Sequence, residues 1–123
     1  MKNLIYPQLS YQITGLCFSA QKDLGRFCKE RQYADKLEQL FKNSKIEYQR
    51  EFEIKNIQPK FPIGNRVDFL VSNKIIIDLK TKNFITKDDY FQIQRYLKAA
   101  NLELGMIINF RDSHLNKAKT CAK

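Results

Sequence analysis

The fold is decided by the stretch RVDFLVSNKIIIDLK, which occupies residues 66–80. It reads as two short apolar strands joined by a polar turn, and each strand carries one acid, Asp68 or Asp78. Aspartate is depleted in strands, and a carboxylate on a mostly buried sheet is unfavourable unless a cation or hydrogen-bond donors meet it. The stretch contains such a cation, because Lys80 follows Asp78 by two residues.

Side chains alternate between the two faces of a strand, which fixes how the acids point. The apolar residues of the first strand should share one face, namely Val67, Phe69 and Val71. Asp68 then projects from the opposite face. In the second strand Asp78 and Lys80 share a face, so a hairpin can bring both acids and the lysine together.

The two acids face each other in only one hairpin register. Asp68 lies opposite Asp78 if Val71 opposes Ile75, which leaves residues 72–74 as the loop. A three-residue loop with a central asparagine is a common hairpin connection, because asparagine tolerates positive φ. Facing carboxylates repel each other, and a hard divalent cation such as Mg²⁺ relieves the repulsion while keeping several of its waters. The register therefore predicts a metal site.

The helical spacing of apolar residues predicts two helices before the hairpin and one after it. The first runs from Ser10 to a stop at Gly25, and the second covers about residues 27–43. The third opens at Thr86, where Asp89 three residues later completes a capping box.

Two further strands complete the pattern. Residues 45–55 alternate imperfectly, which predicts a strand with a bulge or break near Arg50. Residues 104–110 form a last apolar strand, and the strand, helix, strand order predicts a parallel crossover. The fold class is therefore α/β, in the order α-α-β-β-β-α-β, with a mixed four-stranded sheet flanked by helices. We expect a single domain over residues 1–123. Residues 111–123 form a basic tail that either contacts backbone phosphates or is frayed, and we expect it to be frayed.

Composition narrows the classes of function. The chain has 22 Lys and Arg against 13 Asp and Glu, a net charge of +9, which fits either binding to a polyanion or simple solubility. His114 is the only histidine, so Ser-His and Cys-His mechanisms and histidine-rich metal sites lack their parts. The three cysteines form no C-x-x-C pair and indicate reduced thiols. With no signal peptide and no apolar run long enough to cross a bilayer, we expect a cytoplasmic protein and no membrane partner.

The Asp68 and Asp78-Leu79-Lys80 spacing resembles the acid, acid-x-Lys signature of the PD-(D/E)XK nuclease superfamily. Other motifs resemble a small bacterial family of that superfamily, named for a Gly-x-x-Glu-x-x-x-x-Arg (GxxExxxxR) signature. The similar positions, spread over about residues 9–110, are Gly25, Glu30, Tyr33, Leu37, Ile46 to Glu51, Arg66, Gln92, Tyr96, Leu97, Gly105, Ile108, Asn109 and Phe110.

The chain departs from that signature at two positions. Phe27 stands in place of its glycine and Asp35 in place of its arginine. Arg31, one helical turn before Asp35, could reach a similar place. Asp78 also replaces the more common glutamate, which shortens the reach to a metal by one methylene.

The resemblance implies a restriction-endonuclease-like core and metal-dependent hydrolysis of a nucleic-acid phosphodiester, with DNA the favoured substrate. It implies that Asp68, Asp78 and the Leu79 carbonyl bind Mg²⁺, for which Mn²⁺ can substitute. Glu30 would hold a metal-bound water or a second ion. Lys80 would orient the attacking water and offset the charge that grows on the phosphate.

Several alternatives stay open. Gln92 and Tyr96 lie four residues apart on one helix, so they either border the substrate, as the resemblance implies, or are a surface glutamine and a half-buried tyrosine. Glu30 is either an active-site acid or a solvated acid that complements the helix dipole. The whole chain could instead be an inactive nucleic-acid-binding module of the same fold, or a partner for an acidic protein. A homodimer is compatible with the sequence.

Overall fold

The computed structural model describes residues 5–115 and 119–122. Its elements, in chain order, are α1 (Pro7–Leu24), α2 (Glu30–Asn43), β1 (Tyr48–Glu53), the 3₁₀ turn η1 (Ile54–Asn56), β2 (Arg66–Val71), β3 (Ile75–Lys80), α3 (Lys87–Ala100), β4 (Leu104–Asn109) and β5 (Lys119–Ala122). The predicted α/β class and the predicted order of helices and strands are confirmed.

One mixed sheet runs through the molecule in the order β1-β2-β3-β4-β5. The predicted parallel crossover joins β3 to β4, and the other neighbouring strands pair antiparallel. The four predicted strands form the sheet as expected, but the expectation that the tail frays is wrong for β5. That strand pairs with β4, where Ala122 opposes Leu104 and Lys119 opposes Ile107.

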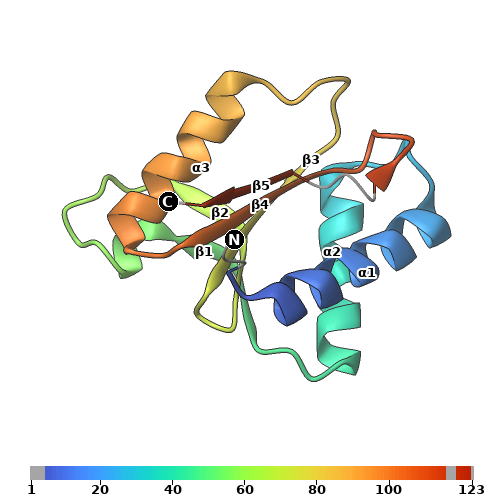
Figure 1. Cartoon of the computed structure of the whole chain (residues 1–123), viewed down its shortest axis with the longest axis horizontal. Helices are drawn as coiled ribbons and strands as arrows, with labels where there is room; N and C mark the ends of the chain where they lie inside the picture. Colours follow the sequence, from blue (N-terminus) through green and yellow to red (C-terminus); the bar gives the residue numbers. More distant parts are fainter. Residues whose placement is uncertain (1–4, 116–118, 123) are drawn as a thin grey trace, which may run out of the picture.

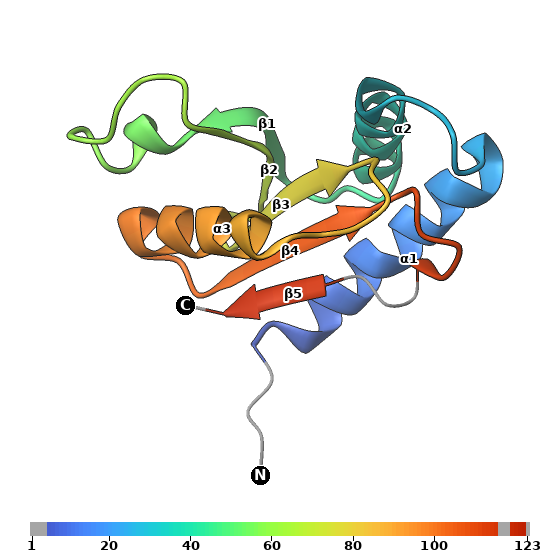
Figure 2. The same cartoon turned by 90° about the horizontal axis from the view of Figure 1, so that it is seen from above.

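Helices cover both faces of the sheet (Figure 1). α1 and α2 pack on one face over a core that includes Ile13, Leu37, Phe41, Phe69, Ile77 and Ile108. α3 and η1 pack on the other face, around Ile54, Leu70, Ile76, Ile93, Leu97 and Ile107. The view from above looks onto the α3 side of the sheet, where α3 lies beside β3 and β4 (Figure 2). None of the helices in the described ranges combines the length and apolarity needed to cross a bilayer.

Local signals set the helix ends. α1 begins at Pro7, three residues before the predicted start, because proline is well suited to a first helical turn. It ends at Leu24, and Gly25 caps it with a φ of 80°, a conformation that glycine adopts with little strain. α2 begins at Glu30, later than predicted, because Gln32 caps its start: the Lys29 amide donates to Gln32 Oε1 at 2.9 Å. The capping box of α3 is confirmed, since the Thr86 hydroxyl accepts from the Asp89 amide at 3.3 Å.

The hairpin has the predicted register. Val71 pairs with Ile75 and Phe69 with Ile77, and residues 72–74 form the loop. Both Ser72 and Asn73 have positive φ. The sequence pattern predicted this conformation for the asparagine, and the structure shows it for the serine as well.

The strand before the hairpin is interrupted where a break was predicted. Arg50 and Phe52 both pair with β2, but Glu51 between them does not and has a φ of 54°. Beyond this break Phe52 pairs with Val67, and Phe52 packs in the core on the α3 side of the sheet. Val67 therefore packs in the α3 core, whereas the sequence pattern had placed it on the same face as Phe69.

Candidate functional site

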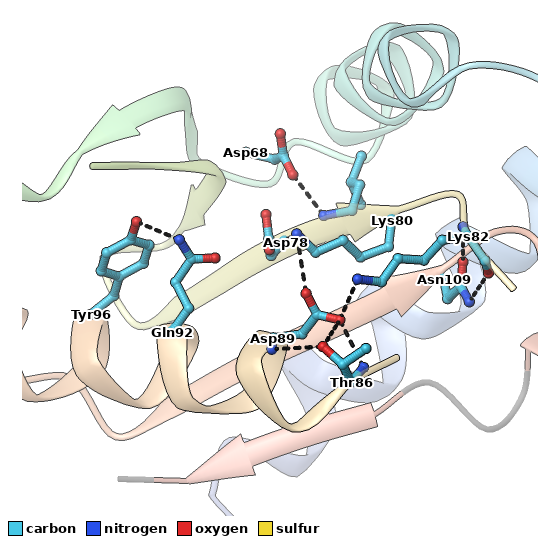
Figure 3. Close-up of polar contacts among 10 residues, drawn as sticks. Asp68, Asp78, Lys80, Lys82, Thr86, Asp89, Gln92, Tyr96 and Asn109 are labelled. Atoms are coloured by element: carbon cyan, nitrogen blue, oxygen red, sulfur yellow. Dashed lines mark hydrogen bonds and ion pairs between the residues drawn. The ribbon is translucent and has the colours of Figure 1, made fainter. Parts of the chain in front are cut away.

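The site lies where β2 and β3 separate. Their pairing ends at Phe69 and Ile77, and continuing the register by one residue places Asp68 beside Asp78. The backbones of these two described strands do not pair at this point. The Leu79 amide instead donates to Asp68 Oδ2, with an N-to-O distance of 2.6 Å (Figure 3). Because the N–H and C=O of one strand residue point to the same side, the Leu79 carbonyl also faces this gap.

The charge on Asp68 is unfavourable in this position. Burial raises the pKa of the Asp68 carboxyl to about 7, and the neighbouring Asp78 carboxyl and Glu30 contribute in the same direction. The Leu79 amide opposes this rise by stabilising the ionised form. Within the described part of the chain no Lys or Arg lies within ion-pair distance of Asp68, so the site has an acceptor that a cation would stabilise.

Lys80 lies on the α3 side of β3, between two acids. Its Nζ is 3.0 Å from Asp78 Oδ2 and 3.8 Å from Asp89 Oδ1. Burial acts to lower the pKa of Lys80, but the carboxylates of Asp78 and Asp89 outweigh it and raise the pKa above its ordinary value. The ammonium is therefore charged at neutral pH.

Asp89 was predicted only as a helix cap, but the structure makes it part of the site. It is 9% exposed, and its Oδ2 accepts from Lys82 Nζ at 2.7 Å and from the Thr86 amide at 2.8 Å. Burial raises the pKa of Asp89, but the bonds from Lys82 and Thr86 lower it further, so the net shift is downward. Only the fold shows that the first turn of α3 lies against Lys80.

Asn109 fixes the segment that follows β3. Its side-chain amide donates to the Lys82 carbonyl at 2.6 Å and its oxygen accepts from the Lys82 amide at 3.1 Å. The side chain is 3% exposed, at the end of β4 beside Lys80. Asn109 thus holds the backbone of Lys82 against the sheet, which keeps the lysine next to Asp89 (Figure 3).

A cleft of about 730 Å³ opens next to Asp68. Its lining comes from α2, β1 and β2 and includes Glu30, Arg31, Ala34, Asp35, Arg50, Glu51 and Asp68. Glu30 is the first residue of α2 and is exposed, yet it shares this cleft with Asp68. The structure therefore brings together the sequence-predicted Glu30 and Asp68, with Glu51 as an additional acid.

Arg50 is a functional candidate that the sequence pattern did not single out. Its Nη1 lies 2.7 Å from Asp35 and 2.9 Å from Glu38. Asp35 occupies the position where the resembling signature has arginine, and here it holds an arginine supplied by β1. The cleft thus keeps guanidinium groups on its wall, from Arg50 and from Arg31.

Gln92 and Tyr96 point together, as their spacing predicts. Gln92 Nε2 donates to the Tyr96 hydroxyl at 3.1 Å, and that hydroxyl donates to Asn65 Oδ1 at 3.1 Å. Tyr96 is 5% exposed, more buried than the half-buried alternative allowed, and it anchors the segment before β2. Gln92 lines a second, smaller cleft of about 460 Å³ on α3, together with Asp89 and Arg95.

The donor set suits a hard cation that retains water. Nowhere in the described residues do three or more His, Cys, Asp or Glu side chains cluster in a way that could hold a metal. Mg²⁺, however, is commonly bound by only one or two carboxylates together with waters and phosphate oxygens. Asp68 and Asp78, adjacent and mutually repelling, fit that mode.

A family model described as the PD-(D/E)XK nuclease superfamily matches residues 7–120. None of the curated proteins and none of the solved structures matches the chain.

Proposed function

Because the chain belongs to the PD-(D/E)XK nuclease superfamily, whose members are generally nucleases, we propose that it hydrolyses phosphodiester bonds of DNA with the help of Mg²⁺. One observation carries the proposal. Asp68 and Asp78 follow the last paired residues of β2 and β3, their carboxyl groups interact directly, and the Lys80 ammonium is 3.0 Å from Asp78.

Asp68, Asp78 and the Leu79 carbonyl would hold the metal, and Glu30 would hold one of its waters or a second ion. The bound ion would polarise a water and offset phosphate charge. Asp68 binds a proton readily without metal, so metal binding should release that proton. Mn²⁺ should substitute for Mg²⁺, since both accept oxygen ligands.

Lys80 would orient the attacking water and stabilise charge on the phosphate. Its raised pKa keeps it protonated, so it serves as a hydrogen-bond donor and a cation and does not serve as a general base. Asp78 and Asp89 fix its position from two sides. Such preorganised charge is effective because it needs no rearrangement during the reaction.

Gln92 would contact the substrate with its side-chain oxygen, because its amide nitrogen already donates to Tyr96. Tyr96 would act indirectly, by holding Gln92 and Asn65 in place. The proposal includes a single domain, which the match over residues 7–120 supports. It also includes a cytoplasmic location, which the free thiols of Cys17, Cys28 and Cys121 support.

The test is incubation of the purified protein with end-labelled single- and double-stranded DNA and RNA, in Mg²⁺, Mn²⁺ or EDTA. We expect cleavage of DNA with either metal and none in EDTA. Asp78→Asn should abolish cleavage, whereas Asp23→Asn, which alters an exposed acid of α1 that pairs with Lys36, should not. Cleavage that persists in EDTA would refute the metal mechanism. Metal-dependent binding without cleavage of any substrate would favour the inactive binding module.

A further inference from the structure

An exposed aromatic ring lies next to two arginines, close in sequence to Glu30 of the site. Phe27, in the turn between α1 and α2, is 75% exposed. The guanidinium carbons of Arg26 and Arg111 each lie 5.2 Å from the centre of its ring. We call these three residues the Arg-Phe-Arg patch. Cations are attracted to the face of an aromatic ring, and an exposed ring with cations beside it can stack with a planar ligand that carries negative charge.

The patch is held rigidly. Arg26 Nε donates to the Arg111 carbonyl at 2.9 Å, and Arg111 Nε donates to the Arg26 carbonyl at 3.2 Å. These reciprocal bonds tie the turn after α1 to the segment after β4. The guanidinium groups are therefore oriented before any partner arrives, which reduces the entropy lost on binding.

Buried side chains support both segments from below. The Tyr33 hydroxyl donates to the Gly25 carbonyl and accepts from the Cys28 amide, which brackets Phe27. The Tyr33 ring stacks on Phe110 at 4.0 Å between centroids. With this support the turn cannot easily refold to bury Phe27, so its exposure is a property of the fold.

The patch carries uncompensated positive charge. Neither Arg26 nor Arg111 has a carboxylate within ion-pair distance among residues 5–115 and 119–122, whereas Arg50 in the cleft has two. Guanidinium groups donate to phosphate oxygens in a fixed fork, and their planes stack on bases as aromatic rings do. An exposed ring next to two guanidinium groups that have no carboxylate partner in the described ranges therefore suits a base with its phosphates.

The patch is attached to the site at both ends. Glu30 starts α2 three residues after Phe27, so their Cα atoms are at most about 11 Å apart. Phe110, next to Arg111, donates its amide to the Lys80 carbonyl at 2.9 Å. A strand bound at the proposed catalytic residues could reach the patch within a few nucleotides.

We propose that the Arg-Phe-Arg patch binds an unpaired nucleotide, so that the protein prefers DNA with a single-stranded segment next to the scissile bond. The preference in cleavage rests on the proposed nuclease function, but the binding does not. Base pairs in an intact duplex are stacked on their neighbours, so an unpaired base is the form that can stack on the patch.

The test measures binding in Ca²⁺ of fluorescent DNA as a single strand, a blunt duplex and a fully abasic single strand of equal length. Phe27→Ala should weaken binding of the single strand about tenfold, because base stacking contributes roughly 1–3 kcal/mol per base. It should leave the blunt duplex and the abasic strand within twofold. Tyr11→Ala is the matched control, since Tyr11 is 83% exposed on α1, far along the helix from the turn.

A second variant tests the charges. Arg26→Gln with Arg111→Gln should reduce the slope of log affinity against log salt by about 1.4 for the single strand, since each phosphate contact contributes about 0.7. Melting curves should show both variants folded.

The possible outcomes separate this inference from the nuclease proposal. If Phe27→Ala weakens single-strand binding and the wild type cuts nothing, the patch stands and the nuclease proposal fails. If the wild type cuts DNA and Phe27→Ala binds all three probes as the wild type does, the patch is overturned. Equal losses on the abasic strand, or tighter binding to an acidic protein such as polyglutamate than to the single strand, would also overturn it.

Discussion

Asp68 is half-buried next to Asp78, and its stabilising contact in the fold is the Leu79 amide. Its pKa in the folded protein, about 7, lies above its ordinary value of 3.8. As pH rises, the unfolded chain loses this proton first, so the free energy of unfolding falls between about pH 4 and pH 7. That loss persists at higher pH unless a cation binds.

We therefore predict that Asp68→Asn stabilises the metal-free protein at pH 8. Asparagine keeps an oxygen for the Leu79 amide and removes the repulsion from Asp78. In EDTA the variant should melt several degrees above the wild type at pH 8, since about 1 kcal/mol corresponds to roughly 4 °C for a domain of this size. Below pH 4 the two melting temperatures should converge. A variant that melts lower at pH 8 would show that the ionised carboxylate stabilises the empty site.

The same substitution should remove stabilisation by metal. Saturating Mg²⁺ or Mn²⁺ should raise the melting temperature of the wild type and leave that of Asp68→Asn unchanged, because a ligand that binds only the folded state stabilises it. Thermal melts with and without metal measure this directly. An equal rise in both proteins would place the metal elsewhere.

Substituting Lys80 tests whether its charge acts in the proposed catalysis or only attracts phosphate. It is one of 22 basic residues, so Lys80→Ala should change DNA affinity in Ca²⁺ by less than about twofold. Cleavage in Mg²⁺ should slow by on the order of a hundredfold or more, because a preorganised donor to the transition state is lost. Single-turnover kinetics and binding isotherms, measured side by side, check both.

The matched control is Lys74→Ala. Lys74 lies in the loop at the other end of the same hairpin, and its exposed ammonium contacts the Tyr6 ring at 5.4 Å from its centre. It should cleave DNA at the wild-type rate. Equal cleavage rates for Lys80→Ala and Lys74→Ala would remove Lys80 from the mechanism.

At the scale of elements, the site depends on how closely α3 packs on β4. A Cβ placed on Gly105 of β4 would lie 2.7 Å from Ile93 Cδ1 and 2.8 Å from Ile93 Cγ1. These distances are too short, so α3 can approach β4 only over a glycine. That approach brings Asp89 against Lys80.

We predict that Gly105→Ala destabilises the protein by about 1–3 kcal/mol, as overpacked cores do. Ile93→Val, which removes the atom nearest the new Cβ, should restore part of the loss in the double variant. Urea denaturation of the two single variants and the double variant measures the coupling. Purely additive effects would mean that the helix shifts as a whole to make room.

β5 covers the outer edge of β4, although its composition suggested a frayed tail. Cys121 in β5 is 6% exposed and packs in the α3 core with Ile93 and Ile107. A chain ending at Leu115 would expose a long apolar edge. We predict that it melts several degrees lower and aggregates at concentrations where the full chain stays monodisperse, as light scattering would show. Unchanged melting would mean that β5 adds no stability.

At the scale of the whole molecule, charge is distributed unevenly around the site. The net charge is +9, yet the acids Glu30, Glu51, Asp68 and Asp78 gather near the gap between β2 and β3. Basic residues outside that gap should draw in the phosphate backbone, and the acidic centre should remain repulsive until a cation binds. Under the proposed function, attraction to DNA and catalysis would therefore involve different residues.

This arrangement predicts how metal and DNA affect each other. Affinity for DNA should fall steeply with salt in EDTA, because many phosphate contacts release counterions. Ca²⁺ should tighten binding at fixed ionic strength, and Asp78→Asn should lose most of that response while binding more tightly than the wild type in EDTA. Fluorescence anisotropy over a range of salt would test both parts. Identical Ca²⁺ responses in the two proteins would rule out a metal at Asp78.

The sequence alone determined the three helices, the first four strands and the hairpin. Alternation in residues 66–80 gave the register that brings Asp68 beside Asp78, because a shift of one residue would have moved every side chain to the other face. Helix periodicity and the Thr86 cap gave the helices, since both depend on neighbours within a few residues. The resemblance supplied the superfamily, which the match over residues 7–120 supports.

Only the tertiary structure decided which distant side chains complete the site. Asp89 reaches Lys80 because α3 packs over Gly105, and Arg50 enters the cleft because Asp35 and Glu38 of α2 hold it. β5 forms because the edge of β4 supplies backbone hydrogen-bond partners for it. The local sequence of the tail gives no signal for this pairing. These contacts join residues far apart in sequence. Their positions follow from how whole elements pack, which local periodicity and capping do not encode.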